Sequence, residues 1–274
     1  MSAPHLPLVL EPADLEAYLP EPGLLIVDLG KPDIYARAHV PGAVHLNYAH
    51  IVAAHPPAAG LVPEAAQLSA ALSEIGYAPD KHIVAYDDEG GGRAARLLWT
   101  LELIGHRRYS LLNGGLHAWV GERRPVDDQP VTAIPTDHAV VVPAEHPALA
   151  DLDYIRHHLG APGIALVDAR SAMEFTGHKR FAARGGHIPG AVNVDWLSTM
   201  DQQNHLRFKP VEELKQRYAG LGVTPDKEVV VYCQTHHRSA HTFVLLKYLG
   251  YPRLRGYPGS WSEWGNRPDT PVEE

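Results

Sequence analysis

The chain has 274 residues, of which 45% are hydrophobic and 20% charged, and its formal net charge is −8 at pH 7. This composition is typical of a globular protein with one large or two ordinary domains, and the acidic balance argues against nucleic acid as a partner. No stretch approaches the roughly 18 apolar residues of a membrane span, and the first residues lack a secretory signal pattern, so we expect no membrane contact and a cytoplasmic location.

The first half of the chain alternates short apolar runs with helical patterns. Residues 24–29 and 81–86 have the composition of strands, whereas 63–75 and 94–103 have the spacing of helices. This alternation is typical of an α/β domain with a mostly parallel sheet flanked by helices. After the second strand comes the glycine-rich loop DDEGGGR, which begins with Asp87 and lacks the lysine and the spacing of a phosphate-binding loop.

Proline-rich sequence separates the two halves. Residues 125–153 carry five prolines and show no helical period until their end. We expect an interdomain linker there, with one short strand at 139–142.

The second half repeats the first. LLIVDLGKPDIYARAHVPGAVHLNY (24–48) is matched by IALVDARSAMEFTGHKRFAARGGHIPGAVNVDW (164–196), and the second copy carries an insertion before the shared His-(Val/Ile)-Pro-Gly-Ala-Val. The repeat predicts two homologous α/β domains, at 1–126 and 151–274, joined by a linker at 127–150. His39, His187, Asp28 and Asp168 occupy equivalent places in both copies, so we expect them to be structural.

The only cysteine, Cys233, stands where the apolar run 228–232 ends and the polar loop CQTHHRS leads into a helix. The thiolate is the reactive form, and a free thiol with a pKa of about 8.5 is mostly protonated at neutral pH. Loop N–H groups and a helix N-terminus favour an anion at such a strand end. We therefore predict that Cys233 is a catalytic nucleophile and not an inert core residue. A single cysteine excludes an internal disulfide, and a working thiol suits a reducing compartment.

The side chains around the cysteine suit an anionic substrate. Arg238 is always charged and stands at the predicted helix start. Arg180 and Arg184 lie in the insertion of the second copy, and their roles stay open. The predicted substrate-binding residues are Gln234, Thr235, His236, His237, Arg238, Ser239 and Arg184.

A zinc site is the alternative for the same residues. Cys233 is followed by His236, His237 and His241, and zinc accepts sulfur and nitrogen ligands. A metal would occupy the thiolate and end its use as a nucleophile, and no paired-cysteine or His-Glu-x-x-His spacing supports it. We expect no metal and no cofactor.

Five motifs in the second half occur in the order VDAR (167–170), GHIPGAVN (186–193), VYCQTHHRS (231–239), YLGY (248–251) and PGSWSEW (258–264). With the duplication, they resemble the rhodanese family of sulfurtransferases in its tandem form, whose first domain is inactive and whose second is active. The aspartate at the place of the cysteine in the first copy agrees with this, because a carboxylate cannot accept a sulfur atom as a thiolate can. The loop is similar to that of certain bacterial thiosulfate:cyanide sulfurtransferases.

The resemblance implies a double-displacement reaction. Cys233 takes the outer sulfur of a small-molecule donor, holds it as a persulfide and passes it to a thiophilic acceptor such as cyanide. Many thiosulfate enzymes of the family have a basic residue where Thr235 stands, so the donor remains open. Arg238 and two imidazoles favour thiosulfate, and 3-mercaptopyruvate is the alternative.

Two other functions compete with this one. The protein is alternatively a persulfide carrier that receives and delivers sulfur through a sulfur-trafficking protein partner. A phosphatase or arsenate reductase is disfavoured, because those loops place arginine six positions after the cysteine and here it comes at five.

Overall fold

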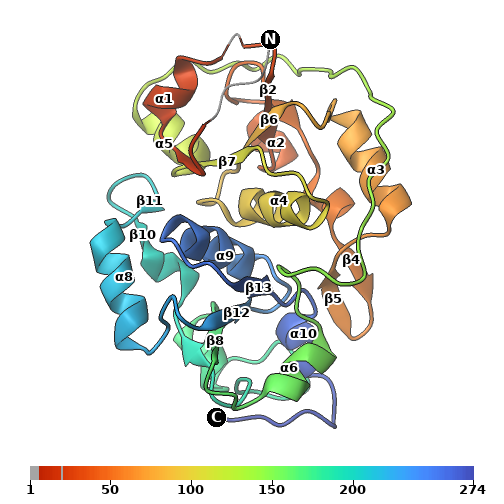
Figure 1. The fold of residues 1–274 in the computed structure, drawn as a ribbon. Helices are drawn as coiled ribbons and strands as arrows, with labels where there is room; N and C mark the ends of the chain where they lie inside the picture. The colour runs from red at the N-terminus through yellow and green to blue at the C-terminus, as the bar shows by residue number, and fades with distance from the viewer. Residues whose placement is uncertain (1–5, 20) are drawn as a thin grey trace. The chain divides into compact units, whose positions relative to one another are not determined.

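The computed structural model describes residues 6–19 and 21–274, and Figure 1 shows its elements in chain order. The chain forms two compact units. The first unit holds the chain up to Ile51, Pro63–Pro143 and Asp201–Phe208. The second holds Val52–Val62, Ala144–Met200 and Lys209–Glu274. Each unit therefore includes a short segment from the other half of the sequence.

The first unit is built on a five-stranded parallel sheet in the order β1-β7-β6-β2-β3. Its helix α4 packs against β6 and β7. Its elements are β1 (Val9–Leu10), α1 (Pro12–Glu16), β2 (Leu24–Asp28), α2 (Pro32–Tyr35), β3 (Val44–His45), η1 (Tyr48–Ile51), α3 (Ala65–Glu74), β6 (His82–Tyr86), α4 (Gly92–Leu103), β7 (Tyr109–Leu112), α5 (Gly115–Gly121) and β11 (Arg207–Phe208).

The second unit is built on a four-stranded parallel sheet in the order β13-β12-β8-β9. An antiparallel hairpin, β4 (Ala53–His55) with β5 (Ala58–Leu61), also belongs to it. The other elements are α6 (Leu152–His158), β8 (Ile164–Asp168), α7 (Ala172–Phe175), β9 (Val192–Asn193), η2 (Trp196–Thr199), α8 (Val211–Gly220), β12 (Glu228–Tyr232), α9 (Arg238–Tyr248), β13 (Leu254–Gly256) and α10 (Ser260–Trp264). Strand β10 (Met200–Asp201) lies where the chain passes from one unit to the other.

These sheets confirm the α/β class with parallel strands and flanking helices. The continuous apolar runs that predicted strands at 24–29 and 81–86 form β2 and β6, and both strands are largely buried. Strands of a parallel sheet are covered on both faces, which explains why they read as unbroken apolar runs. The helical patterns at 63–75 and 94–103 form α3 and α4.

The strand predicted at 139–142 is wrong, because this stretch has no regular structure. The backbone N–H of Val140 donates to the Ser69 hydroxyl of α3 at 3.0 Å. Nearby, the N–H of Thr136 donates to the Ser73 carbonyl at 3.4 Å. The segment runs along helix α3 and does not pair with a strand. Four residues with a high strand propensity do not predict such a contact with a helix.

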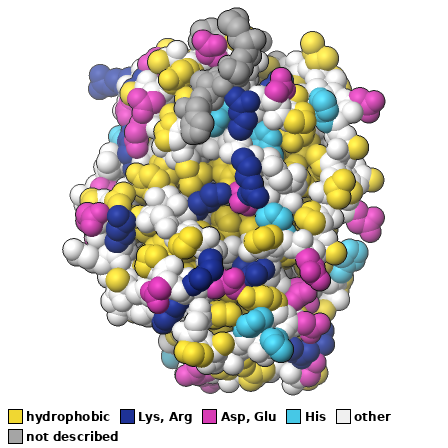
Figure 2. Space-filling view, viewed as in Figure 1, with side chains coloured by type: hydrophobic (Ala, Val, Ile, Leu, Met, Phe, Trp, Pro, Cys, Tyr) yellow, Lys and Arg dark blue, Asp and Glu magenta, His cyan; other side chains and the backbone are white. Residues whose placement is uncertain are grey.

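The surface view in Figure 2 shows basic and acidic side chains interspersed with apolar and neutral ones, without a broad field of one sign on that face. Among the described residues, no helix combines the length and the hydropathy that a membrane crossing needs.

Candidate functional site

Cys233 directly follows β12, a central strand of the second unit's sheet. In the register of that sheet Tyr232 lies beside Asp168, so β8 and β12 end at the same edge. Helix α9 begins at Arg238, and residues 233–237 form the loop between strand and helix. The cysteine is free and fully buried, at the carboxyl edge where parallel sheets place their sites.

The loop makes the thiol acidic. Burial by itself raises the pKa of Cys233, because a charged sulfur loses its contact with water. The positive charge of Arg238, the Ser239 hydroxyl and the backbone N–H groups of Ser239 and Thr235 lower the pKa, and together they outweigh burial. The pKa of Cys233 therefore lies below that of an ordinary thiol, so a larger fraction is thiolate at neutral pH.

Ser260, the first residue of α10, holds the loop together. Its hydroxyl oxygen accepts from the N–H of Cys233 at 3.2 Å and from the N–H of His236 at 3.1 Å, and it donates to the Tyr257 carbonyl at 2.7 Å. His236 has a left-handed backbone with φ of 51°, and Ser260 has φ of 52°. Such a conformation costs a residue other than glycine about 1 to 3 kcal/mol, so the contacts around it must hold it in place.

Glu174 of α7 holds Arg238 through two parallel hydrogen bonds. The Arg238 guanidinium donates to the two carboxylate oxygens at 2.7 and 2.8 Å. Glu174 also forms a capping box with Ser171 at the start of α7, which fixes the carboxylate. The ion pair therefore fixes the position of the Arg238 guanidinium beside the loop. Sequence analysis missed Glu174, although the Ser-x-x-Glu spacing at 171–174 was a usable signal for the cap.

The ion pair predicts a loss of stability in acid. Burial raises the pKa of Glu174, but hydrogen bonding and charge pairing with Arg238 prevail and lower it to about 2, from 4.5. The carboxylate therefore stabilises the fold fully above pH 4.5, and this contribution disappears as the pH falls toward 2. We expect the stability difference between the wild type and Glu174→Gln to shrink by about 2 kcal/mol from pH 6 to pH 3, measured by urea unfolding. A difference that is the same at both pH values would contradict this pairing.

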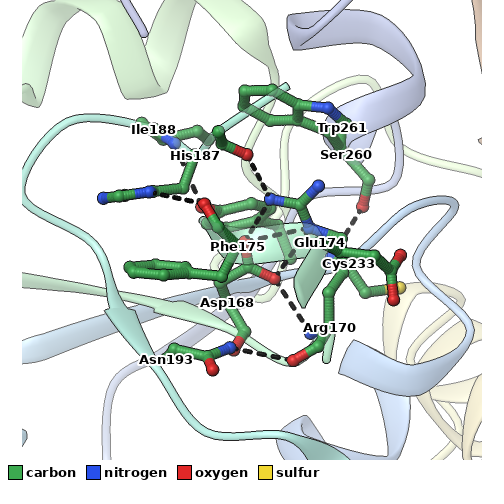
Figure 3. Close-up of polar contacts among 12 residues, drawn as sticks. Asp168, Arg170, Glu174, Phe175, His187, Ile188, Asn193, Cys233, Ser260 and Trp261 are labelled. Carbon is green, nitrogen blue, oxygen red and sulfur yellow. Dashed lines mark hydrogen bonds and ion pairs between the residues drawn. The ribbon is translucent and has the colours of Figure 1, made fainter. Parts of the chain in front are cut away.

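A second ion pair, between Arg170 and Asp168, is buried at the end of β8. Arg170 donates to Asp168 through Nη2 at 2.6 Å and through Nε at 3.0 Å (Figure 3), and both side chains are fully buried. Arg170 also donates to the Gly186 carbonyl at 2.8 Å, and its guanidinium lies 4.5 Å from the ring centre of Trp261. Through the contact of Arg170 with Trp261, the pair joins the end of β8 to α10.

The remaining predicted loop residues make contacts of different kinds with their neighbours. The Gln234 amide donates to the Phe181 carbonyl at 3.1 Å, which ties the loop to the insertion. The buried His236 ring shares a hydrogen bond of 2.8 Å with the Ser239 hydroxyl. The His237 ring lies 5.8 Å from that of Trp196. Of the predicted loop side chains, those of Arg238 and Ser239 act on the Cys233 thiol, whereas the Gln234 amide bonds to the insertion.

The arginines of the insertion are engaged elsewhere in the second unit. The Arg184 guanidinium donates to the carbonyls of Thr270 at 2.6 Å and Trp264 at 2.8 Å. Arg180 donates to the Gly177 carbonyl at 3.3 Å. The contacts of Arg184 bind the C-terminal segment to α10, so its guanidinium is occupied by protein groups.

The two histidines shared by the repeats bond to backbone carbonyls. Nδ1 of His39 lies 2.8 Å from the Tyr35 carbonyl, and Nδ1 of His187 lies 2.9 Å from the Phe175 carbonyl. Each imidazole stacks on the aromatic ring of that same residue. Among residues 6–19 and 21–274, no group of three or more His, Cys, Asp or Glu side chains is arranged to hold a metal ion.

In the first unit, the Asp87 carboxylate fills the equivalent loop. It accepts from the backbone N–H groups of Glu89 at 3.0 Å, Gly91 at 2.8 Å, Arg93 at 2.9 Å and Ala94 at 3.0 Å. Burial raises the pKa of Asp87, the Glu89 carboxylate adds to that rise, and the amide donors oppose it. The amide cradle of this unit is occupied by the protein's own side chain.

Asp87 therefore has a structural consequence that can be measured. In Asp87→Ala, four N–H groups lose their acceptor, two of them buried and two half-buried, and we expect the free energy of unfolding to fall by about 2 to 4 kcal/mol. Turnover at 25 °C should stay close to the wild-type value, because the thiol is in the other unit. Asp137→Ala, at an exposed position, is the control and should change neither quantity. A tenfold loss of turnover in folded Asp87→Ala would contradict a purely structural role.

The family model for the rhodanese-like domain matches residues 11–122 and 151–267. The chain belongs to the rhodanese family. Both repeats are matched, so it is a tandem rhodanese, as the motifs predicted.

Full-length relatives of this tandem rhodanese share high identity with it. It is 48% identical to the thiosulfate sulfurtransferase of Azotobacter vinelandii over 98% of this chain and 97% of that protein. It is 45% identical to the thiosulfate sulfurtransferase of Pseudomonas aeruginosa with the same coverage. The sulfur carrier protein TtuD of Thermus thermophilus is 32% identical over 97% of this chain and 96% of its own length.

Solved structures share the rhodanese fold at lower identity. The crystal structure of YnjE matches with a TM-score of 0.85 and 24% identity over 98% of this chain and 68% of that chain. The wild-type structure of EanB matches with a TM-score of 0.79 and 23% identity over 91% of this chain and 63% of that chain. This chain therefore spans less than two thirds of EanB, and at these identities the likeness concerns the fold alone.

Proposed function

We propose that this rhodanese is a thiosulfate sulfurtransferase in which Cys233 carries the transferred sulfur as a persulfide. The observation that carries the proposal is a buried thiol whose pKa is lowered by Arg238 and by the N–H groups of its own loop. The two relatives at 48% and 45% identity, both named thiosulfate sulfurtransferase, support thiosulfate as the donor.

The reaction proceeds in two displacements. The Cys233 thiolate attacks the outer sulfur of thiosulfate, the bond between the two thiosulfate sulfurs breaks, and sulfite leaves with the electron pair. The cysteine then carries a terminal anionic sulfur. Cyanide attacks that sulfur, thiocyanate leaves, and the thiolate returns. Each step moves an anion near the loop, so N–H donors directed at the sulfur stabilise it throughout the cycle.

We assign a role to each part of the loop. Arg238 keeps the thiol ionised and attracts the donor dianion. The residues Gln234 to Ser239 form the cradle, and Ser260 keeps it closed. Arg184 is left out of the site because its guanidinium binds the C-terminal segment.

The two domains have different roles in this proposal. Residues 1–126 form a rhodanese-like domain without catalysis, 127–150 form the linker, and 151–274 form the catalytic domain. The reaction needs a reduced thiol, which suits the cytoplasm.

A second function is favoured by one relative. The Thermus thermophilus protein is named a sulfur carrier, and a persulfide held in a loop can also pass to a protein partner. Fast loading by thiosulfate with slow turnover to cyanide would favour the carrier.

The proposal is tested by steady-state turnover. Purified protein is given thiosulfate with cyanide, 3-mercaptopyruvate with cyanide, or an aryl phosphate. We expect thiocyanate to form with the highest kcat/KM from thiosulfate and no phosphate to be released. A higher kcat/KM with 3-mercaptopyruvate would reassign the donor, and phosphate release would overturn the reaction class.

A further inference from the structure

The β4–β5 hairpin comes from the first half of the sequence but belongs to the second unit. Strand β5 packs against α10, as Figure 1 shows, and the N–H of Ala59 donates to the Ser262 hydroxyl at 3.1 Å. Helix α10 begins with Ser260, whose hydroxyl holds the N–H groups of Cys233 and His236. The hairpin is therefore anchored to the helix that closes the sulfur-transfer loop.

Gly60 of β5 lies against the loop itself. A Cβ atom at this position would lie 2.1 Å from the Thr235 carbonyl oxygen and 2.8 Å from the Pro258 carbonyl oxygen. Carbon and oxygen atoms that are not bonded cannot approach so closely, so even a methyl group would displace the hairpin or the Thr235 carbonyl. The φ angle of Gly60 is not positive, so its backbone conformation does not require glycine. Glycine is needed here because there is no room for a Cβ atom.

The carbonyl that Gly60 contacts belongs to the peptide between Thr235 and His236. On the other side of that peptide, the His236 N–H donates to the Ser260 hydroxyl at 3.1 Å. One peptide group is thus bonded on its N–H side to Ser260 of α10, and its C=O side lies against Gly60 of β5. This peptide precedes the left-handed His236, so its orientation sets the path of the loop around the thiol.

We propose that Gly60 is a positioning residue for sulfur transfer, because it lets β5 hold the Thr235–His236 peptide in the orientation that closes the loop around Cys233. The inference rests on the proposed function. A segment encoded in the first repeat is then a working part of the catalytic loop, and the cysteine-bearing repeat does not build its site alone.

The test is Gly60→Ala in the full chain. The pH dependence of Cys233 alkylation should shift upward by about one pH unit, because the displaced peptide weakens the donors around the sulfur. The kcat for thiosulfate and cyanide should fall by about tenfold to a hundredfold, as loss of one anion donor typically causes. Gly220→Ala in α8, where a Cβ would meet nothing within 4 Å and φ is not positive, is the matched control and should leave both quantities unchanged.

A second variant keeps the test decisive if Gly60→Ala does not fold. Ser262→Ala removes the hydroxyl that accepts from the Ala59 N–H and donates to the Gly259 carbonyl at the start of α10, and it should shift the alkylation profile in the same direction by a smaller amount. A folded Gly60→Ala variant with the kcat and the alkylation profile of the wild type would overturn the inference. Turnover by the wild-type protein itself would still support the proposed function in that case. If Gly60→Ala is unfolded, an unchanged profile in Ser262→Ala overturns it. Absence of turnover in the wild type would instead refute the proposed function.

Discussion

Replacing Cys233 by serine is expected to abolish sulfur transfer and to leave the fold intact. The serine hydroxyl is almost fully protonated at neutral pH, and an oxygen at this position cannot form the persulfide that the second displacement requires. We expect kcat to fall by at least about a thousandfold, as happens when a covalent nucleophile is removed. The measurement is thiocyanate formation from thiosulfate and cyanide.

Serine suits this test because it nearly preserves the size of the buried side chain. The urea midpoint of the variant should stay close to that of the wild type, which separates loss of chemistry from loss of structure. Ser198→Ala, in the second unit outside the loop, controls for a substitution of similar size. Turnover above a tenth of the wild-type value in Cys233→Ser would refute the nucleophile assignment.

Replacing Arg238 by methionine should give the second largest loss. The guanidinium is the principal group that opposes the effect of burial on the Cys233 pKa, so without it the alkylation profile should move upward by at least about one pH unit. The donor dianion also loses its cation. We expect kcat/KM for thiosulfate to fall by about a hundredfold or more.

Two further variants separate the contributions of Arg238. Arg238→Lys keeps the charge but loses the paired hydrogen bonds to Glu174, so it should recover part of the thiol acidity and less of the turnover. Arg37→Met removes an arginine from an exposed ion pair with Asp33 and should change neither. An unchanged alkylation profile in Arg238→Met would show that the loop amides alone keep the sulfur ionised.

Local sequence patterns were enough to predict the sheets and the position of the thiol. The runs 24–29, 81–86 and 228–232 form strands that are buried on both faces in parallel sheets. Consecutive residues of these strands are therefore mostly apolar, and this pattern can be recognised in the sequence. Cys233 follows such a run and precedes a polar loop, so its place at the carboxyl edge of the sheet follows from chain order alone.

Contacts between distant segments could not be predicted in the same way. Glu174 lies 64 positions from Arg238, and Gly60 contacts a carbonyl far along the chain from it. Ser260 has a left-handed backbone, which a sequence pattern predicts only for glycine. Its hydroxyl bonds to backbone N–H groups more than twenty residues earlier in the chain. At 139–142, β-branched residues suggested a strand, but the chain follows α3, where the Ser69 hydroxyl accepts from the Val140 N–H and the Ser73 carbonyl accepts from the Thr136 N–H.

The persulfide itself provides the most direct test of the account. The intact mass of the protein is measured after treatment with cyanide, again after addition of thiosulfate and removal of excess, and once more after a second treatment with cyanide. We predict a gain of one sulfur atom on the peptide that contains Cys233, its loss with cyanide, and no gain in Cys233→Ser. Thiocyanate formation by a protein whose Cys233 never gains that sulfur would contradict the central claim.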